Sequence, residues 1–286
     1  MPCSRRWRAV WCACLLTLLL ITPTMLPQMA AAASPTVRLS VTSGDIGRNV
    51  TVSYRGYAKN RGVRITWDGT TIASATTSAV GDGSTVIAVP NGVKGGHKVK
   101  VIGGDFSASA TFTIRPQIRM SPATVGVEQT VSVSFRGYAA GESVKVTLDS
   151  STSAIVTVKM SSTGSGSARF AMSATVGGSH KFSGKSSGGS TDNVSFRVVP
   201  TITLIPASGA PGANIRVHLR GYTNGERIEL QFRDPDQTSS LGFATASSTG
   251  SVNVTFTVPR KATRGTHGVI GRGYGVSVAE TAFQVT

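Results

Sequence analysis

The chain has 286 residues, of which 29 are Lys or Arg and 13 are Asp or Glu, and 40% of its residues are hydrophobic. This apolar content excludes a disordered or collagen-like polymer, and the length allows one to three domains. All three cysteines lie at or before Cys14, so the remainder of the chain can form neither disulfides nor thiolate metal sites.

Residues 1–33 predict a signal peptide. Three arginines and an apolar run over residues 9–21 precede an Ala-rich segment that ends at Ala33, where cleavage is expected. The apolar run is shorter than the roughly 18 residues that a spanning helix needs, so a permanent membrane anchor is the weaker interpretation. No later stretch is apolar enough to span a bilayer, so no integral membrane span is expected after cleavage. We therefore expect an extracellular protein, either secreted or loosely associated with the cell surface.

Residues 34–286 contain three copies of one unit. An Arg-Gly-Tyr tripeptide recurs at separations of 81 and 84 residues, and an alternating apolar series precedes each copy. The three tripeptides are Arg55-Gly56-Tyr57, Arg136-Gly137-Tyr138 and Arg220-Gly221-Tyr222. A second alternating series follows each tripeptide at the same spacing, so two strands are predicted in register three times. The unit boundaries are expected at 34–116, 117–200 and 201–286.

Each unit has the composition of a small β-sandwich. Period-two alternation, many Val, Thr and Ser residues, and Gly-rich breaks about every 8 to 12 residues predict about seven short strands and no helix. A sheet with one apolar face must cover that face, and two antiparallel sheets packed together do so within roughly 100 residues. We therefore expect an all-β fold of three tandem immunoglobulin-like β-sandwich domains after the signal peptide.

The Arg-Gly-Tyr tripeptide has a structural interpretation that needs no ligand. The apolar positions around it are three residues apart instead of two, which predicts a β-bulge at the glycine. The arginine is then expected on the solvated face. The tyrosine is expected in the core, with its hydroxyl near an edge where it can find a hydrogen-bond partner.

The unit resembles the bacterial immunoglobulin-like and IPT/TIG-type early-set repeats that occur in tandem in secreted and surface proteins. The third copy carries the fullest set of their short motifs. These are Pro211-Gly212, Gly221-Tyr222, Gly225-Glu226, Gly250-Ser251, Val258-Pro259, Gly265-Thr266-His267 and Phe283-Gln284-Val285. The resemblance covers residues 35–286, although the first copy has Arg61-Gly62-Val63 where the motif has Gly-Glu. It implies spacing, display or adhesion, and it implies no common catalytic residues.

The histidines are candidate zinc ligands. His97, His180 and His267 occupy equivalent places in three separate units, so in a linear array they are too far apart to share one ion. Each is instead expected to begin a strand with its ring bonded to backbone. Asp234-Pro235-Asp236 is a possible calcium ligand set, but a turn is the favoured interpretation because a calcium site needs about six oxygens or more.

No catalytic constellation is recognisable in the sequence. A hydrolase needs a nucleophile with a base and an orienting acid, or two carboxylates in a cleft, and no Gly-x-Ser-x-Gly elbow stands between a strand and a helix. We therefore expect a non-enzymatic protein without catalytic residues, cofactor or metal, and keep a secreted hydrolase as the weakest of three hypotheses.

The basic balance is the one global property that points to a partner. The three units hold 10, 8 and 8 basic residues against 4, 4 and 5 acidic ones, so the charge is spread along the chain. Nucleic acid is not expected, because its binding calls for clustered Lys and Arg with exposed aromatic residues, and the aromatic residues here fit core positions. Anionic envelope polymers or polysaccharide are the expected partners, although the charge can also serve solubility alone.

Two functional hypotheses follow from these observations. The first is a structural spacer or adhesion module held at the envelope partly by positive charge. The alternative is a carbohydrate-binding module that recognises one glycan through the loops of one repeat.

Overall fold

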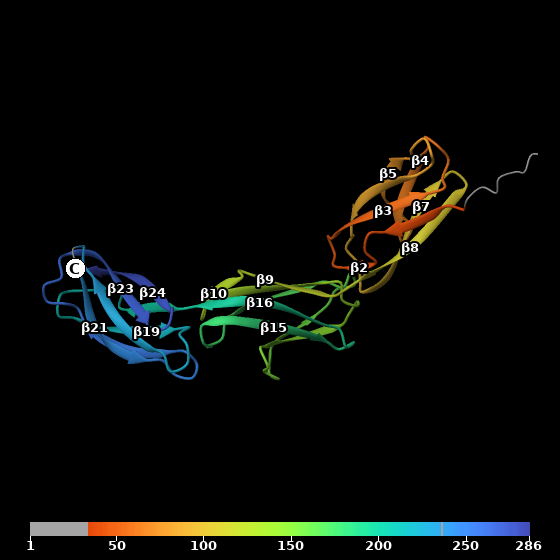
Figure 1. Cartoon of the computed structure of the whole chain (residues 1–286). Coiled ribbons are helices and arrows are strands. Elements are labelled where there is room, and N and C mark those ends of the chain that lie inside the picture. The colour runs from red at the N-terminus through yellow and green to blue at the C-terminus, as the bar shows by residue number, and fades with distance from the viewer. Residues whose placement is uncertain (1–33, 236) are drawn as a thin grey trace, which may run out of the picture. The chain divides into compact units, whose positions relative to one another are not determined.

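The computed structural model describes residues 34–235 and 237–286, so the predicted signal peptide lies outside the described residues. Residues 35–286 consist of strands, turns and short connections. No helix that could span a membrane occurs in the described part of the chain. Three repeated units each combine a three-stranded and a five-stranded sheet (Figure 1), so the predicted all-β fold of tandem immunoglobulin-like sandwiches is confirmed.

The same strand order recurs in each unit. In the first unit, one sheet runs β1 (Thr36–Leu39), β3 (Asn49–Arg55), β6 (Gly83–Ala88), and the other runs β2 (Ser43–Gly44), β8 (Phe106–Ile114), β7 (Gly95–Gly103), β4 (Gly62–Trp67), β5 (Thr70–Thr76). In the second unit, the sheets run β9 (Gln117–Ser121), β11 (Thr130–Arg136), β14 (Gly166–Ala171), and β10 (Thr124–Gly126), β16 (Thr191–Val199), β15 (Gly178–Ser186), β12 (Ser143–Leu148), β13 (Ala154–Lys159). In the third unit, they run β17 (Thr201–Ile205), β19 (Asn214–Arg220), β22 (Val252–Thr257), and β18 (Ser208–Gly209), β24 (Val278–Val285), β23 (Gly265–Gly273), β20 (Arg227–Arg233), β21 (Thr238–Thr245).

Each unit thus has eight strands instead of the seven expected, because its first strand is split in two. The first piece pairs antiparallel in the three-stranded sheet, as β1 does with β3. The second piece crosses to the five-stranded sheet and pairs parallel with the last strand of the unit, as β2 does with β8. One segment therefore contributes to both sheets and closes one side of the sandwich.

The alternating apolar series predicted from the sequence form three separate cores. In β3, Val50, Val52 and Tyr54 are buried while the residues between them face outward, and β11 and β19 repeat this pattern. The buried residues fall into three hydrophobic clusters that share no member, one for each unit. Period-two burial of this kind gives each sandwich its own apolar interior.

The repeated irregularity lies elsewhere than predicted. The strand before each tripeptide ends at the arginine, so the glycine makes a turn beyond the ladder instead of a bulge within it. The β-bulge occurs in the following strand, between Ile65 and Thr66 in the first unit, and β12 and β20 have register shifts at the matching positions. The predicted bulge was wrong because a left-handed turn absorbs the extra residue equally well.

Candidate functional site

The histidines of the three Gly-x-His motifs lie near the starts of β7, β15 and β23. In each unit a glycine with positive φ opens the strand, and the histidine ring packs beside an aromatic ring. The ring centroids lie 5.2 Å apart for His97 and Trp67 and 5.0 Å apart for His267 and Phe232, in stacked orientation. His180 and His267 are buried, so their ring nitrogens need partners inside the protein.

Both ring nitrogens of each histidine find an oxygen. Nδ1 lies beside an aspartate carboxylate, at 2.6 Å for His97 and Asp68, 2.8 Å for His180 and Asp149, and 2.8 Å for His267 and Asp234. Nε2 faces the backbone carbonyl four residues earlier, at 2.9, 2.9 and 2.7 Å in the same order. The backbone contact agrees with the sequence prediction, whereas the aspartate is a further partner. Its signal in the sequence is an aspartate that follows the same strand in all three units.

In each unit the histidine ring therefore lies between an aspartate carboxylate and a backbone carbonyl. Burial raises the pKa of Asp149, but hydrogen bonds from His180 and from the Lys181 N–H outweigh it and lower that pKa. The pKa of Asp68 is lowered in the same way by His97 and the Lys98 N–H.

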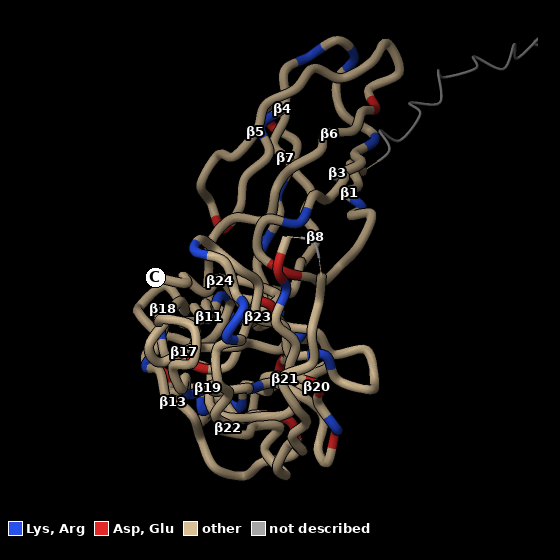
Figure 2. Tube along the Cα trace, turned by 90° about the vertical axis from the view of Figure 1, so that its left-hand side faces the viewer, with Lys and Arg blue, Asp and Glu red and all other residues tan. Residues whose placement is uncertain are grey.

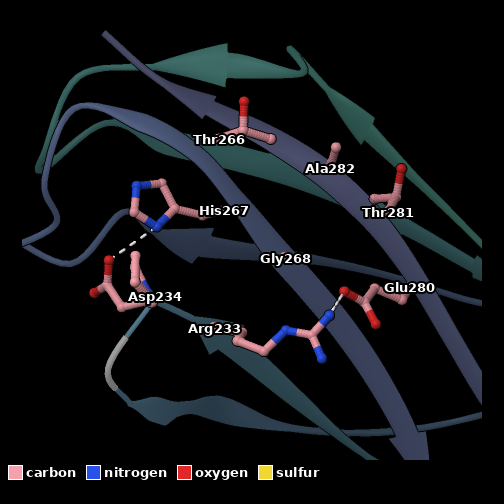
Figure 3. Close-up of a pocket in the computed structure, with 9 residues that line it drawn as sticks. Arg233, Asp234, Thr266, His267, Gly268, Glu280, Thr281 and Ala282 are labelled. Atoms are coloured by element: carbon pink, nitrogen blue, oxygen red, sulfur yellow. Dashed lines mark ion pairs between the residues drawn. The ribbon is translucent and has the colours of Figure 1, made fainter.

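The pair in the third unit borders a surface hollow of about 650 Å³ (Figure 3). The His267 side chain is 1% exposed, and its contact with Asp234 is an ion pair whose angles do not make an aligned hydrogen bond. Arg233 and Glu280 form a second ion pair in the same hollow. Asp236, the other carboxylate of the possible calcium set, lies outside the described residues.

Among the described residues, no group of three His, Cys, Asp or Glu side chains is placed to hold a metal ion. In the hollow, the Thr266 hydroxyl donates to the Gln284 side chain and His267 Nε2 lies 2.7 Å from the Thr263 carbonyl, so the described residues place no hydroxyl on the histidine ring.

The glycines of the Arg-Gly-Tyr tripeptides have φ values of 78°, 68° and 72°, in the left-handed region. The tyrosine that follows each is buried. The hydroxyl groups differ: Tyr57 donates to the Val101 carbonyl at 3.1 Å and Tyr222 to the Gly271 carbonyl at 2.9 Å. The Tyr138 hydroxyl is buried without a hydrogen-bond partner among the described residues, and burial raises its pKa.

The arginines of the tripeptides differ in how far their side chains are exposed to solvent. Arg55 is 79% exposed at its side chain and lies 3.7 Å from Asp82. Arg220 of the third unit is 23% exposed and binds Glu128 of the second unit, with 3.0 Å between Nε and Oε1. Arg55 therefore agrees with the predicted solvated position, whereas Arg220 makes a contact between the second and third units.

The expectation that aromatic residues occupy core positions is wrong at three places. Phe106, Phe243 and Tyr274 are 46%, 52% and 66% exposed. Phe106 and Tyr274 stand at the β7–β8 and β23–β24 hairpins, and alternation in the sequence did not distinguish these residues from core members. The aromatic residues therefore do not themselves argue against a nucleic acid partner.

Lys and Arg occur along the whole described chain (Figure 2). Many stand at the outward positions of strands, as Lys181, Lys185 and Arg197 do in β15 and β16. Because these side chains alternate with buried ones, the positive charge covers sheet faces instead of gathering at one point.

Comparison with known families finds one match. The model of the macroglobulin-like domain matches residues 194–284, which lie almost entirely in the third unit. That is less than half of the chain, and the IPT/TIG-type resemblance stays a prediction. No curated protein matches the sequence.

Three similar solved structures illustrate the fold. A tetra-tandem repeat from the extending region of a large adhesion protein is 18% identical, with 88% of this chain and 74% of that chain covered and a TM-score of 0.33. Trypsin-activated alpha-2-macroglobulin from Escherichia coli is 12% identical, with 88% of this chain and only 23% of that one covered and a TM-score of 0.25. SGBP-B of the Bacteroides ovatus mixed-linkage glucan utilization locus, in complex with a mixed-linkage heptasaccharide, is 15% identical, with 88% and 70% covered and a TM-score of 0.30.

Because these TM-scores are low, no function is inferred from the likeness. The chain is an all-β protein of three immunoglobulin-like sandwiches, and the third of them is similar to the macroglobulin-like domain.

Proposed function

We propose that the protein is a non-enzymatic, exported repeat protein that acts as a spacer or adhesion module and binds anionic envelope polymers through its spread positive charge. The observation that carries this proposal is the excess of basic residues in each unit, 10 to 4, 8 to 4 and 8 to 5. A polymer with many weak anionic sites gains from charge that is distributed over a long surface.

Contacts between consecutive units support the spacer role. The Lys94 ammonium of the first unit lies 2.9 Å from Oε1 of Glu142 in the second, and Arg220 binds Glu128 across the next joint. Backbone bonds accompany both ion pairs, from the Lys94 N–H to the Tyr138 carbonyl and from the Gly177 N–H to the Tyr222 carbonyl. Consecutive units that have their own cores and contact one another directly are consistent with a spacer.

The histidine–aspartate pairs support a structural role, because the same pair occurs at equivalent positions in all three units. In the same proposal, the Arg-Gly-Tyr tripeptides are structural elements of units bounded at 34–116, 117–200 and 201–286.

The test is co-sedimentation of the purified protein with polyuronate beads at low and high salt. Exposed charge is screened over about 10 Å at 0.1 M salt, so binding at 0.5 M should be at least tenfold weaker than at 0.05 M. Replacing Lys181, Lys185 and Arg197 by Gln should weaken low-salt binding partially, because the other units keep their charge. Equal binding at both salt concentrations would contradict the electrostatic part of the proposal.

A carbohydrate-binding module remains the second candidate. The observation that favours it is the exposed aromatic pair in the third unit, Phe243 and Tyr274.

A further inference from the structure

The third unit carries an exposed patch that its siblings lack. Phe243 lies on β21, and Tyr274, Val276 and Val278 lie in the β23–β24 hairpin or at its end. Their exposed fractions are 52%, 66%, 90% and 46%. We call these four residues, together with Arg227, Glu229 and Arg272, the aromatic patch.

Arg227 joins the two aromatic rings. Its guanidinium carbon lies 4.3 Å from the centroid of the Phe243 ring and 5.5 Å from that of Tyr274, within the range of cation–π contacts. The Arg227 carbonyl also accepts the Tyr274 N–H at 2.9 Å, which fixes the hairpin beside β20. The hairpin itself is closed by a Gly273 N–H to Ser277 carbonyl bond of 2.7 Å. The rings are therefore held in place before any ligand arrives.

Charged side chains continue the patch across the sheet. Glu229 of β20 stands directly opposite Phe243 of β21 and directly opposite Arg272 of β23, so the three form a row on one face. A hollow of about 580 Å³ adjoins this row. It is lined by Glu229, Arg272, Gly273, Tyr274, Gly275, Val276 and Val278. Its size fits a small ligand, and its lining combines apolar surface with a few charged groups.

The fold does not require these side chains. The position of Glu229 corresponds to Arg64 in the first unit and Lys145 in the second, and the residues opposite them on the neighbouring edge strands are Ser74 and Thr157. Both units form the same five-stranded sheet without an aromatic residue at that place. The sheet itself therefore does not explain the exposed aromatic pair of the third unit.

We propose that the aromatic patch binds an acidic oligosaccharide. The C–H face of a sugar ring lies on the Phe243 and Tyr274 rings, whose π faces are negative. A sugar carboxylate binds the guanidinium groups of Arg227 and Arg272, and sugar hydroxyls donate to Glu229. This inference rests on the proposed function, since acidic polysaccharide is one anionic polymer, and it adds a specific site to the spread charge.

Charge complementarity favours an acidic oligosaccharide as the ligand of the aromatic patch. Two arginines against one glutamate favour an anionic ligand over a neutral sugar. In the described chain Arg227 and Arg272 form no ion pair with a carboxylate, so their N–H donors are available. An apolar peptide would cover these charged groups without pairing them, which is unfavourable.

Isothermal titration calorimetry at about 0.15 M salt tests the proposal, because Arg227 and Arg272 can still pair with a carboxylate there, and a repeat at 0.5 M salt measures the stacking contribution alone. The probes are an oligogalacturonate and a neutral glucose oligomer of equal length. We expect saturable binding of the acidic probe and at least tenfold weaker binding of the neutral one. Phe243→Ala with Tyr274→Ala should weaken acidic binding at least tenfold, and Arg227→Lys should reduce the preference for the acidic probe.

Phe106→Ala is the matched control, because Phe106 is exposed on the equivalent hairpin of the first unit and no arginine of the described residues lies over its ring. It should bind as the unchanged protein does. Thermal unfolding of each variant shows whether the third unit remains folded.

The proposal is overturned if the double variant binds as tightly as the unchanged protein, or if neutral and acidic probes bind equally. It is also overturned if the patch instead binds a single-stranded oligonucleotide more tightly, or if the double variant abolishes self-association in sedimentation. Co-sedimentation at low salt distinguishes the two proposals. If the aromatic patch is not a ligand site but the spread charge does bind anionic polymers, the double variant and the unchanged protein still bind polyuronate equally at 0.05 M salt.

Discussion

The β15–β16 hairpin of the second unit and the β23–β24 hairpin of the third occupy the same place in their sandwiches but carry different side chains. The first is built of Ser and Gly, with the Ser190 N–H bonded to the Ser186 hydroxyl at 2.9 Å. The second presents Tyr274 and Val276 to solvent. Beneath both hairpins lies a buried glutamate, Glu142 or Glu226.

This comparison separates what the sandwich needs from what the surface is free to vary. Each unit keeps a buried tyrosine, a histidine–aspartate pair and a glycine whose carbonyl accepts the tyrosine N–H at 3.0 Å. Two contacts recur in all three units: the tyrosine N–H donates to the glycine carbonyl, and the histidine Nε2 lies beside a backbone carbonyl. Buried polar atoms need such partners, so these groups belong to the sandwich itself. The hairpin tip has no such constraint, so it is the place where one unit can acquire a ligand site.

The largest expected effect concerns the shared interior. Gly250 and Gly225 both have φ of 71°, but a Cβ at Gly250 would overlap the Tyr222 carbonyl, whereas nothing lies within 4 Å of one at Gly225. Gly225→Ala should cost about 1 kcal/mol of unfolding free energy from backbone strain. Gly250→Ala should cost about 3 kcal/mol or more, because overlap adds to strain. Denaturant unfolding measures both.

The second unit offers the same comparison, because Gly164 and Gly141 have φ of 70° and 71°. A Cβ would overlap the Tyr138 carbonyl at Gly164, whereas nothing lies within 4 Å of one at Gly141. Similar losses for Gly250→Ala and Gly225→Ala would contradict the steric explanation.

The second prediction concerns the glutamate under the hairpin of the second unit. Burial raises the pKa of Glu142, but hydrogen bonds from Ser186, Lys94 and the Ala139 N–H outweigh it and lower the pKa to about 2. A carboxyl with a lowered pKa contributes stability that is present above its unfolded value of 4.5 and is lost as the pH falls toward 2. Glu142→Gln should remove that part of the acid sensitivity and cost about 2 kcal/mol at pH 7.

Hydrogen exchange of β15 and β16 as a function of pH measures this effect in the second unit. Glu128→Gln is the control, because Glu128 is 68% exposed in its ion pair with Arg220 and should cost less than about 1 kcal/mol. An unchanged pH dependence in Glu142→Gln would show that the carboxylate is not the titrating group.

The smallest effect distinguishes two buried tyrosines. Tyr222→Phe removes a 2.9 Å hydrogen bond to the Gly271 carbonyl and should cost about 1 kcal/mol. Tyr138→Phe removes a buried hydroxyl that has no partner among the described residues, so it should be neutral or stabilising by up to about 1 kcal/mol. Thermal unfolding of the two variants compares them directly. A loss above about 1 kcal/mol in Tyr138→Phe would show that its hydroxyl has a partner, such as an ordered water.

The sequence by itself determined the repeat and the inside–outside pattern. Val50, Val52 and Tyr54 were predicted on the core face because a strand alternates with period two, and the same argument held in all three units. The turn position of the histidines also followed from the Gly-x-His spacing, since a glycine at a strand start is a local signal.

Only the tertiary structure decided which side chains meet. His267 and Asp234 are 33 residues apart and come together because β23 pairs with β20, and Arg227, Phe243 and Tyr274 gather from three segments in the same way. The splitting of each first strand between two sheets was likewise set by the need to close the sandwich. Alternation in the sequence predicts on which face of a sheet a side chain lies. Its neighbours on that face belong to strands that are distant in the sequence, so they can be identified only when the register and the order of the strands are known.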